Sequence, residues 1–192
     1  CERITKKTLK LDETRQLIIE AQQGNQAALN QLFSNWYRRV FNIAYKYFSD
    51  NQLAKEISQQ TFLVVQEKLG QLREPATFKV WLYRIVTNQC HEHQRKRKTR
   101  NNYEEKYGIA TMITPTKSPD TLYENNERAQ LILQAIQQLP EEQRTVLIMK
   151  EYEGLKFREI AEVLGISENT AKSRLYYGLK ALRKMNFIKK SL

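Results

Sequence analysis

Apolar residues in the first half of the chain recur every three or four positions, the spacing that places them on one face of an α-helix. The clearest set is Leu29, Leu32, Phe33, Trp36, Val40, Phe41 and Ala44. Sustained alternation of apolar and polar residues, which would indicate a strand, does not occur there. The pattern predicts a helical bundle from Leu11 to about Arg100, with main helices over about 27–48, 52–69 and 78–97.

Two stretches interrupt this pattern. Residues 72–77 are predicted to form a loop, because Pro75 biases the residue before it away from the helical conformation. Residues 101–125 combine prolines with several Ser, Thr and Asn residues and have no apolar face. We expect this second stretch to be a flexible linker, and the predicted division is an N-terminal domain over 1–100, a linker over 101–124 and a C-terminal domain over 125–192.

The helical spacing returns after the linker. Four further helices are predicted, over about 127–138, 141–152, 156–164 and 168–184. The fold class is therefore predicted to be all-α, with two small helical domains joined by a flexible tether.

The charge of the chain points to polyanionic partners. Lys and Arg number 32 against 21 Asp and Glu, a formal net charge of +11, which attracts nucleic acid or an anionic surface. No run approaches the roughly 18 apolar residues of a membrane span, and no apolar block follows the first basic residues. We therefore expect no membrane insertion and a cytoplasmic location.

The cysteine and histidine content indicates no metal or catalytic site. Cys1 and Cys90 are too few for a disulfide framework and form no C-x-x-C pair. Residues 90–93 read Cys-His-Glu-His, but consecutive helical residues point about 100° apart and cannot converge on one ion. We expect reduced thiols, no cofactor and no enzymatic activity. A first residue of Cys1 leaves open a shortened chain, which we favour, or the mature end of a lipoprotein.

The stretch FREIAEVLGISENTAKSRLYYGLKAL, residues 157–182, is typical of a helix-turn-helix. Gly165 suits the left-handed end of the first helix, and Ser167 suits the N-cap of the second. The stripe expected to be buried on the second helix is Ala171, Leu175, Leu179 and Leu182. The remaining face carries groups able to reach bases or phosphates, which are Glu168, Asn169, Lys172, Ser173 and Tyr176, and Arg174 and Lys180 flank them. The alternative is an ordinary helical pair whose polar face is only solvated.

Together with LPEEQRTVLIMKEYEG before it, this segment resembles the fourth conserved region of bacterial sigma-70 family sigma factors, over residues 139–183. The N-terminal half resembles the second conserved region through AYKYFSD from Ala44, QQTFL from Gln59, WLYRIVTN from Trp81 and RKRK from Arg95. Nothing with the length of the other sigma regions lies between them. The chain is thus similar to the compact extracytoplasmic-function (ECF) type.

This resemblance implies a bacterial protein that binds core RNA polymerase, directs it to promoters and helps to open the DNA, without catalysis of its own. Promoter DNA would be bound as duplex and as single strand, and an anti-sigma factor is a further expected partner. The free protein is expected to be a monomer. The alternative is a helix-turn-helix regulator that works without polymerase, which leaves the Trp-Leu-Tyr-Arg-Ile segment unexplained.

The resemblance also assigns residues to the upstream promoter element. The recognition helix would enter the major groove of the minus-thirty-five element, with Lys172, Ser173 and Tyr176 at the usual contact positions and Arg174 at a phosphate. Tyr177 stands where the family often has a basic residue and would hydrogen-bond a phosphate instead.

For the minus-ten element, the family holds an unstacked base of the non-template strand in the loop before the Trp-Leu-Tyr-Arg helix. The candidates carried over to this chain are Leu72, Arg73, Phe78, Lys79, Arg84, Asn88, Arg95 and Arg97. Trp81 is expected in the core. For Tyr83 the sequence does not decide between burial in the core and contact with the DNA single strand. The basic run from Arg95 to Arg100 suits phosphates, or it is a solvated helix end.

Polymerase docking is expected on the second predicted helix, at Glu56, Gln59, Gln60 and Phe62. Acids are common in the family where this chain has Leu53, Lys55 and Gln60, so we expect a less electrostatic contact. The linker of roughly 25 residues would average about 28 Å between its ends as a coil. Such a tether cannot hold two domains at promoter spacing, so polymerase would have to hold them and the free protein would bind promoters poorly.

Overall fold

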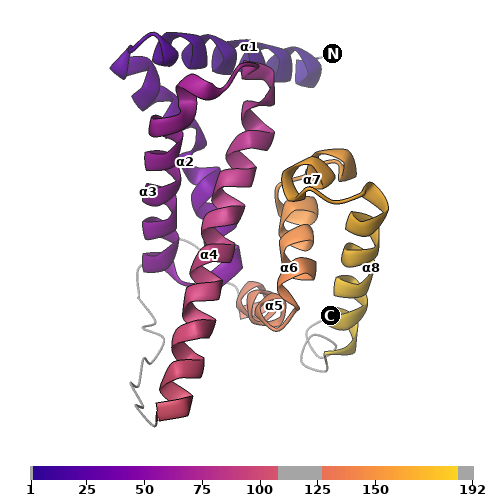
Figure 1. Cartoon of the computed structure of the whole chain (residues 1–192). Helices are drawn as coiled ribbons and strands as arrows, with labels where there is room; N and C mark the ends of the chain where they lie inside the picture. Colours follow the sequence, from indigo (N-terminus) through magenta and orange to yellow (C-terminus); the bar gives the residue numbers. More distant parts are fainter. Residues whose placement is uncertain (1, 108–126, 186–192) are drawn as a thin grey trace.

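The computed structural model describes residues 2–107 and 127–185, and within these ranges every regular element is helical, which confirms the all-α prediction (Figure 1). The first range contains α1 (Glu2–Gln22), α2 (Gln26–Phe48), α3 (Asn51–Lys68) and α4 (Phe78–Tyr107), with short 3-10 turns at Leu69–Gln71 and Pro75–Thr77. The second contains α5 (Glu127–Gln137), α6 (Glu141–Leu147), a π-helical turn η3 (Ile148–Tyr152), α7 (Phe157–Leu164) and α8 (Glu168–Lys184).

Side-chain caps define where the N-terminal helices begin. The Asn25 carboxamide accepts from the first backbone amides of α2, and Asp50 accepts from the amide of Leu53 at the start of α3. Between the two helices Ser49 takes the left-handed conformation, and its amide bonds the carbonyl of Tyr45. The chain therefore reverses direction in two residues, and α2 and α3 pack as an antiparallel pair.

Helix α1 lies across one end of the α2–α3–α4 bundle (Figure 1). The Gln22 carboxamide donates to the carbonyls of Leu69 and Leu72, at 2.9 and 2.8 Å. These bonds satisfy backbone groups of the loop that leads into α4. Helix α1 was not among the three main helices predicted for this half, and it sets the position of that loop.

Helix α4 is longer than predicted. It was expected to end near Arg97, but it continues to Tyr107, so residues 101–107 of the predicted linker belong to the helix. The added residues contain no Gly or Pro before Gly108, and the charged side chains there are tolerated or favoured in a helix. The remainder of the predicted linker, 108–124, lies outside the described residues, and the domain boundaries stay a prediction.

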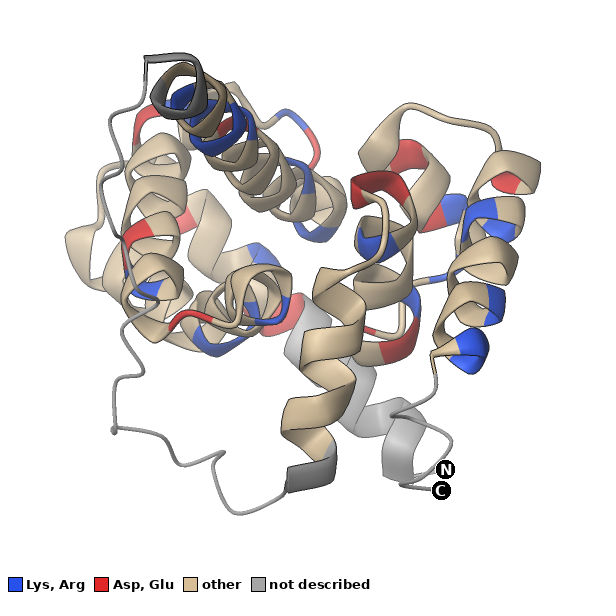
Figure 2. Ribbon diagram, turned by 90° about the horizontal axis from the view of Figure 1, so that it is seen from below, with Lys and Arg blue, Asp and Glu red and all other residues tan. Residues whose placement is uncertain are grey.

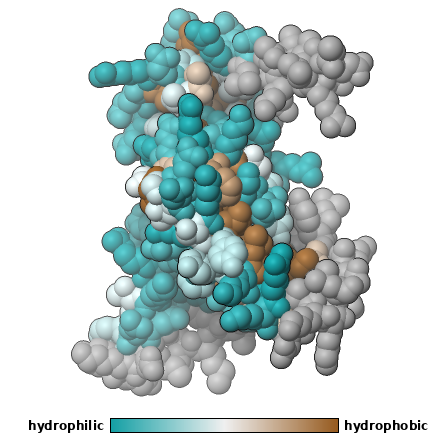
Figure 3. Space-filling model, turned by 90° about the vertical axis from the view of Figure 1, so that its right-hand side faces the viewer, coloured by the Kyte–Doolittle hydropathy of each residue, from teal (hydrophilic) through white to brown (hydrophobic). Residues whose placement is uncertain are grey.

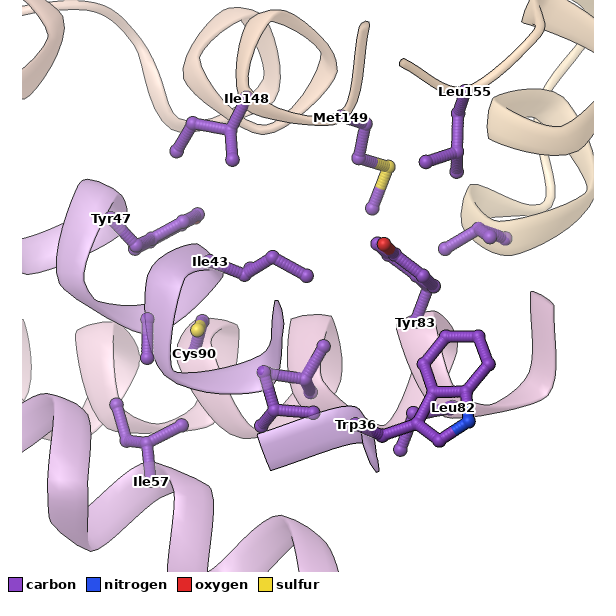
Figure 4. Close-up of a cluster of buried hydrophobic side chains, with 14 of the residues drawn as sticks. Trp36, Ile43, Tyr47, Ile57, Leu82, Tyr83, Cys90, Ile148, Met149 and Leu155 are labelled. Carbon is purple, nitrogen blue, oxygen red and sulfur yellow. The ribbon is translucent and has the colours of Figure 1, made fainter. Parts of the chain in front are cut away.

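The two halves of the chain pack on one another and share apolar contacts. Figure 4 shows Tyr47 and Ile43 of α2 and Tyr83 of α4 directed towards Ile148, Met149 and Leu155 of the C-terminal half. All of these side chains are buried. In this conformation the two halves are therefore held by a common core, in contrast to the loosely tethered arrangement expected from the linker.

Candidate nucleic-acid interface

A tight turn joins α7 to α8 in a helix-turn-helix. Gly165 has a φ of 65°, in the left-handed region, and its amide bonds the carbonyl of Ala161. Two residues later the Ser167 hydroxyl accepts from the amide of Thr170 at 3.0 Å and caps α8. Both roles were predicted from the sequence. They set the angle at which α8 leaves the turn.

The buried side of α8 is made by Ala171, Leu175 and Gly178, which pack towards α6 and α7. Leu179, predicted to be buried, is 36% exposed. The reason is helical geometry, because Gly178 lies closer than Leu179 to the line of Ala171 and Leu175. A Cβ added to Gly178 would lie 3.4 Å from the Cβ of Gln143, so this glycine permits a close approach between α8 and α6.

The opposite side of α8 is open to solvent. It brings together six of the predicted duplex-binding residues, all exposed, namely Glu168, Asn169, Lys172, Ser173, Tyr176 and Tyr177. Tyr176 is 62% exposed, and its ring lies 5.6 Å from that of Tyr177. Basic positions follow the length of α8 (Figure 2), and the face of the molecule bearing α7 and α8 is mainly hydrophilic, with a narrow hydrophobic strip (Figure 3). This face has the shape and chemistry of a recognition helix.

Arg174 differs from these six residues. Its guanidinium lies 2.8 Å from a carboxylate oxygen of Glu142, and its side chain is only 24% exposed. It is therefore held beside α6, and a phosphate would have to compete with Glu142 for it.

The loop before α4 and the first turns of α4 carry several of the residues predicted to bind single-stranded DNA, but two of them are in the core. Phe78 is 1% exposed and meets the ring of Trp36 edge to face at 5.4 Å, and Leu72 is also buried. Neither offers a surface to a base in this conformation, so a direct contact from either is not supported. Trp81, expected in the core, is only partly buried and packs on Phe78 at the edge of the core.

Lys79 and Arg84, in the first turns of α4, contact the C-terminal half of the chain. The Lys79 ammonium lies 2.9 Å from a carboxylate oxygen of Glu159, and the Arg84 guanidinium donates to the carbonyl of Glu162 at 2.6 Å. Tyr83, which the sequence left open, is buried and donates its hydroxyl to Glu153 at 2.7 Å. Burial and the nearby carboxylate raise the pKa of Tyr83, so it remains a hydrogen-bond donor.

The carboxylate of Glu159 has two partners. Partial burial by itself would raise the pKa of Glu159, but hydrogen bonds from the Lys156 amide and the Lys79 ammonium outweigh it, and the pKa lies below its usual value. The bond to Lys156 also begins α7. Glu159 is therefore charged at neutral pH and connects the first helix of the helix-turn-helix to α4.

The far end of α4 is basic and open. Arg95 and Arg97 are exposed there and belong to a run of positive residues visible along the helix in Figure 2. The predicted residues Arg73, in the loop before α4, and Asn88, midway along the helix, are also exposed. A shallow groove of about 480 Å³ is lined by Arg95, Lys96, Thr99, Arg100 and Tyr103. The sequence reading missed Tyr103, because this aromatic residue lay inside the predicted linker. Cations beside an aromatic ring suit a nucleic-acid strand.

A third surface lies between α2 and α3. A groove of about 620 Å³ is lined by Phe33, Ser34, Tyr37, Gln59, Phe62, Leu63 and Gln66. Phe62 forms its floor, with its ring 4.7 Å from Phe33, and Leu63 at the rim is 65% exposed. Of the predicted docking residues, Gln59 and Phe62 line this groove, whereas Glu56 is bonded by the Gln60 amide at 3.2 Å. The sequence reading missed Leu63, although an apolar residue off the buried stripe of a helix was a usable signal.

The residues 90–93 diverge, as their helical spacing requires. Cys90 is buried in the core, and burial raises the pKa of its thiol. His91 lies 3.2 Å from the Thr145 hydroxyl, while Glu92 pairs with Lys96 within α4. Within the described parts of the chain, no helix combines the length and the apolar character that a membrane crossing requires.

Comparisons with known proteins agree with this geometry. Residues 32–100 match the family model for sigma-70 region 2, and residues 129–182 match the one for sigma-70 region 4. The chain is 28% identical over 180 residues to the RNA polymerase sigma-H factor of Pseudomonas aeruginosa, covering 90% of this chain and 93% of that protein. It is 27% identical over 171 residues to the ECF RNA polymerase sigma-E factor of Haemophilus influenzae, covering 85% and 90%.

Two solved structures share the fold. One is CnrH in complex with the cytosolic domain of CnrY, with a TM-score of 0.64 and 22% identity over 89% of this chain and 95% of that chain. The other is the sigma factor RpoE in complex with the anti-sigma factor NepR from Bartonella quintana, with a TM-score of 0.67 and 19% identity over 81% and 94%.

Proposed function

The chain belongs to the sigma-70 family of RNA polymerase sigma factors, of the extracytoplasmic-function type, and we propose that its three described surfaces divide the work of promoter recognition. As a sigma factor it binds core RNA polymerase, directs the enzyme to promoters and promotes opening of the DNA. Which residues perform each step is our proposal.

The outer face of α8 reads the upstream, minus-thirty-five element as duplex. The observation that carries this assignment is the exposed set of polar and aromatic side chains on one side of a capped recognition helix. Lys172 and Tyr176 are exposed on this face, and in the proposal they contact base edges or adjacent phosphates in the major groove. Arg174 contributes by holding α8 against Glu142 of α6.

Helix α4 binds the non-template strand of the minus-ten element. Its basic residues, from Lys79 and Arg84 at one end to Arg95 and Arg97 further along, follow one helix and suit the phosphates of a single strand. Phe78 and Leu72 support the loop from within the core, so bases would contact the residues around them. Asn88 supplies an exposed amide for a base edge.

The groove between α2 and α3 is the proposed docking site for core polymerase. Its aromatic floor and exposed Leu63 support a contact made mainly by apolar packing. Lys55 stands where an acid is common in the family, and this departure agrees with a less electrostatic interface.

An anti-sigma factor is a further proposed partner. The relatives CnrH and RpoE are each recorded in complexes, the second with an anti-sigma factor named as such. Both cover most of this chain. A polymerase-independent regulator is less well supported, because it gives no role to the region 2 match over 32–100 or to the basic residues of α4.

Run-off transcription with bacterial core polymerase tests the function. The protein is added to a library of promoter fragments at fixed salt, and defined start sites are expected only when it is present. Lys172→Ala should weaken start-site selection, and Leu63→Asp should reduce transcription from every promoter. Specific duplex binding without any transcript would favour the regulator instead.

A further inference from the structure

The side chain of Lys172, on the outer face of α8, contacts an aromatic ring of the neighbouring helix. Its ammonium lies over the ring of Phe157, the first residue of α7, at 5.9 Å from the ring centroid. Helices α7 and α8 pack on one another around the turn at Gly165 (Figure 1). A cation within about 6 Å of an aromatic face is attracted by the negative face of the π system. The contact therefore links the first helix of the helix-turn-helix to a side chain of the recognition helix.

The ring of Phe157 is itself held in place. It is partly buried and packs against the core. The turn before it is fixed by the buried Leu155, whose amide donates to the carbonyl of Met149 at 3.0 Å. The amide of Lys156 donates to Glu159 at 2.7 Å, which fixes the first turn of α7. The ring is therefore a fixed part of the fold, and the flexible partner is the lysine over it.

The contact orients Lys172 without neutralising its charge. Among the residues that the structure describes, Lys172 has no carboxylate partner. Arg174 on the same helix is different, because a phosphate would have to displace Glu142 from it. A phenyl ring carries no net charge and leaves the three N–H donors of an ammonium able to bond a phosphate or a base. Lys172 is thus both oriented and fully charged.

A second lysine lies over the same ring. The ammonium of Lys150 is 4.8 Å from the centroid of Phe157, and it donates to the carbonyl of Leu155 at 3.3 Å. Lys150 is thereby tied to the turn before α7. Of the two cations, only Lys172 belongs to the exposed face of α8. A change at Phe157 affects both lysines, so each must be varied separately.

From these contacts we propose that Phe157 is a positioning residue for duplex recognition, because its ring holds the Lys172 side chain in place on the outer face of α8. The proposal rests on the proposed function, since it assumes that Lys172 contacts DNA. A free lysine side chain loses much rotamer freedom when it is immobilised at an interface. The ring restricts that freedom before DNA arrives, so less is lost on binding.

Nuclear magnetic resonance of the free, full-length protein tests the contact. Carbon-13 labelling of lysine reports the ε-methylene protons, which an aromatic ring above them shifts upfield. The signal of Lys172 is assigned by its loss in Lys172→Arg, and the exposed Lys180 of the same helix is the reference. Phe157→Leu should move the Lys172 signal to the position of Lys180. A Lys172 signal that already coincides with that of Lys180 in the parent would overturn the proposal.

A double-mutant cycle tests the role in DNA binding. The affinity of the complex of this protein with core polymerase is measured on a promoter fragment identified by run-off transcription. Phe157→Leu keeps an apolar side chain but has no π face, and it should weaken binding by about 2- to 5-fold. In a Lys172→Ala background the same change should leave affinity unchanged. An equal loss in both backgrounds would identify a structural effect and overturn the proposal.

Two further variants make this result specific. Phe157→Tyr keeps the aromatic face and should bind as the parent does. Lys150→Met removes the second cation from the ring and should also leave binding unchanged. A loss from Lys150→Met equal to that from Phe157→Leu would assign the effect to the turn before α7 and overturn the proposal. Cooperative thermal unfolding checks that each variant is folded.

Failure of the proposed function has a different signature. If Lys172→Ala binds the promoter as tightly as the parent, the assignment of Lys172 to the duplex is wrong, and the positioning role fails with it. If Lys172→Ala weakens binding by about fivefold or more but Phe157→Leu does not weaken it, only the positioning role of Phe157 fails.

Discussion

The guanidinium of Arg144 donates to the backbone carbonyl of Tyr47, 97 residues earlier in the chain, at 3.3 Å, and lies over the Tyr47 ring at 5.2 Å. The same guanidinium donates to the carbonyls of Gln137 and Leu139 at 2.8 and 3.0 Å. The buried Arg144 side chain thus hydrogen-bonds carbonyl groups at and just after the end of α5, and it connects the region 4 half to α2. Arg144 belongs to the LPEEQR segment that indicated the family, and this contact gives it a structural role.

Replacing Arg144 should destabilise the protein. Arg144→Ala leaves buried carbonyls without their donor, and we expect the free energy of unfolding to fall by about 2–4 kcal/mol in urea titrations. Arg144→Lys keeps the charge but lacks the planar guanidinium with its several donors. The free energy of unfolding should therefore fall by an intermediate amount. A change below about 0.5 kcal/mol for Arg144→Ala would contradict the role assigned to these bonds.

Acid should weaken the packing of the two halves through His91. Burial lowers the pKa of His91 below 6.5, although the nearby Glu141 and Glu142 oppose this shift. Between the folded and unfolded pKa values the unfolded chain binds more protons, so stability falls as the pH drops below about 6.5. The urea midpoint should decrease from pH 7.5 to pH 5.5.

The variant His91→Gln separates this contribution from the carboxylates. Glutamine can still donate to Thr145 but does not titrate, so the fall in midpoint should be smaller in the variant. Glu159, whose pKa is lowered, contributes in the same direction at lower pH, because its charge is lost as the pH falls through its folded pKa. An unchanged pH dependence in His91→Gln would rule out His91 as the source.

The turn of the helix-turn-helix depends on Gly165. A Cβ added there would meet no neighbour within 4 Å, so the cost of Gly165→Ala comes from the left-handed φ of 65° alone. We expect a loss of about 1–2 kcal/mol in the free energy of unfolding. Gly70→Ala is the matched control, since Gly70 is also uncrowded and its φ is not positive. Equal effects of the two variants would argue against backbone strain.

Duplex recognition should be sensitive to the outer face of α8. Lys172→Ala and Tyr176→Ala should each weaken the binding of the polymerase complex to promoter DNA by about 1–3 kcal/mol. The measurement is a competition between the promoter and a promoter with a mutated upstream element. Arg183→Ala, at an exposed position in the last turn of the same helix, is the control and should have a smaller effect. Arg174→Ala should instead reduce stability, because Arg174 pairs with Glu142.

Docking on core polymerase should depend on Leu63 more than on Glu56. Leu63→Asp places a charge at the rim of the apolar groove, and affinity for core polymerase should fall by about tenfold or more. Because this side chain is 65% exposed, the unfolding temperature should hardly change. Glu56→Gln is the comparison variant. A larger loss of affinity for core polymerase from Glu56→Gln than from Leu63→Asp would indicate an electrostatic contact at this helix.

Local signals in the sequence predicted most of the helical elements, α1 excepted, and one of the candidate sites. Apolar residues at helical spacing, the N-cap Ser167 and the left-handed Gly165 are local signals, and each was located correctly from its neighbours in the chain. The exposed face of α8 follows from the same signals, because a single helix decides which side chains share its outer side. The true length of α4 was missed, since a charged helix without an apolar face resembles a linker in sequence.

How the two halves meet, and which candidate residues remain accessible, depends on the tertiary structure. Phe78 and Lys79 are neighbours in sequence, yet one lies in the core and the other pairs with Glu159, 80 residues away. No local pattern encodes such a pair, because its energy depends on desolvation and distance between groups brought together by the whole fold. For the same reason the sequence did not predict the packing of α7 on α4, which depends on contacts between the two halves.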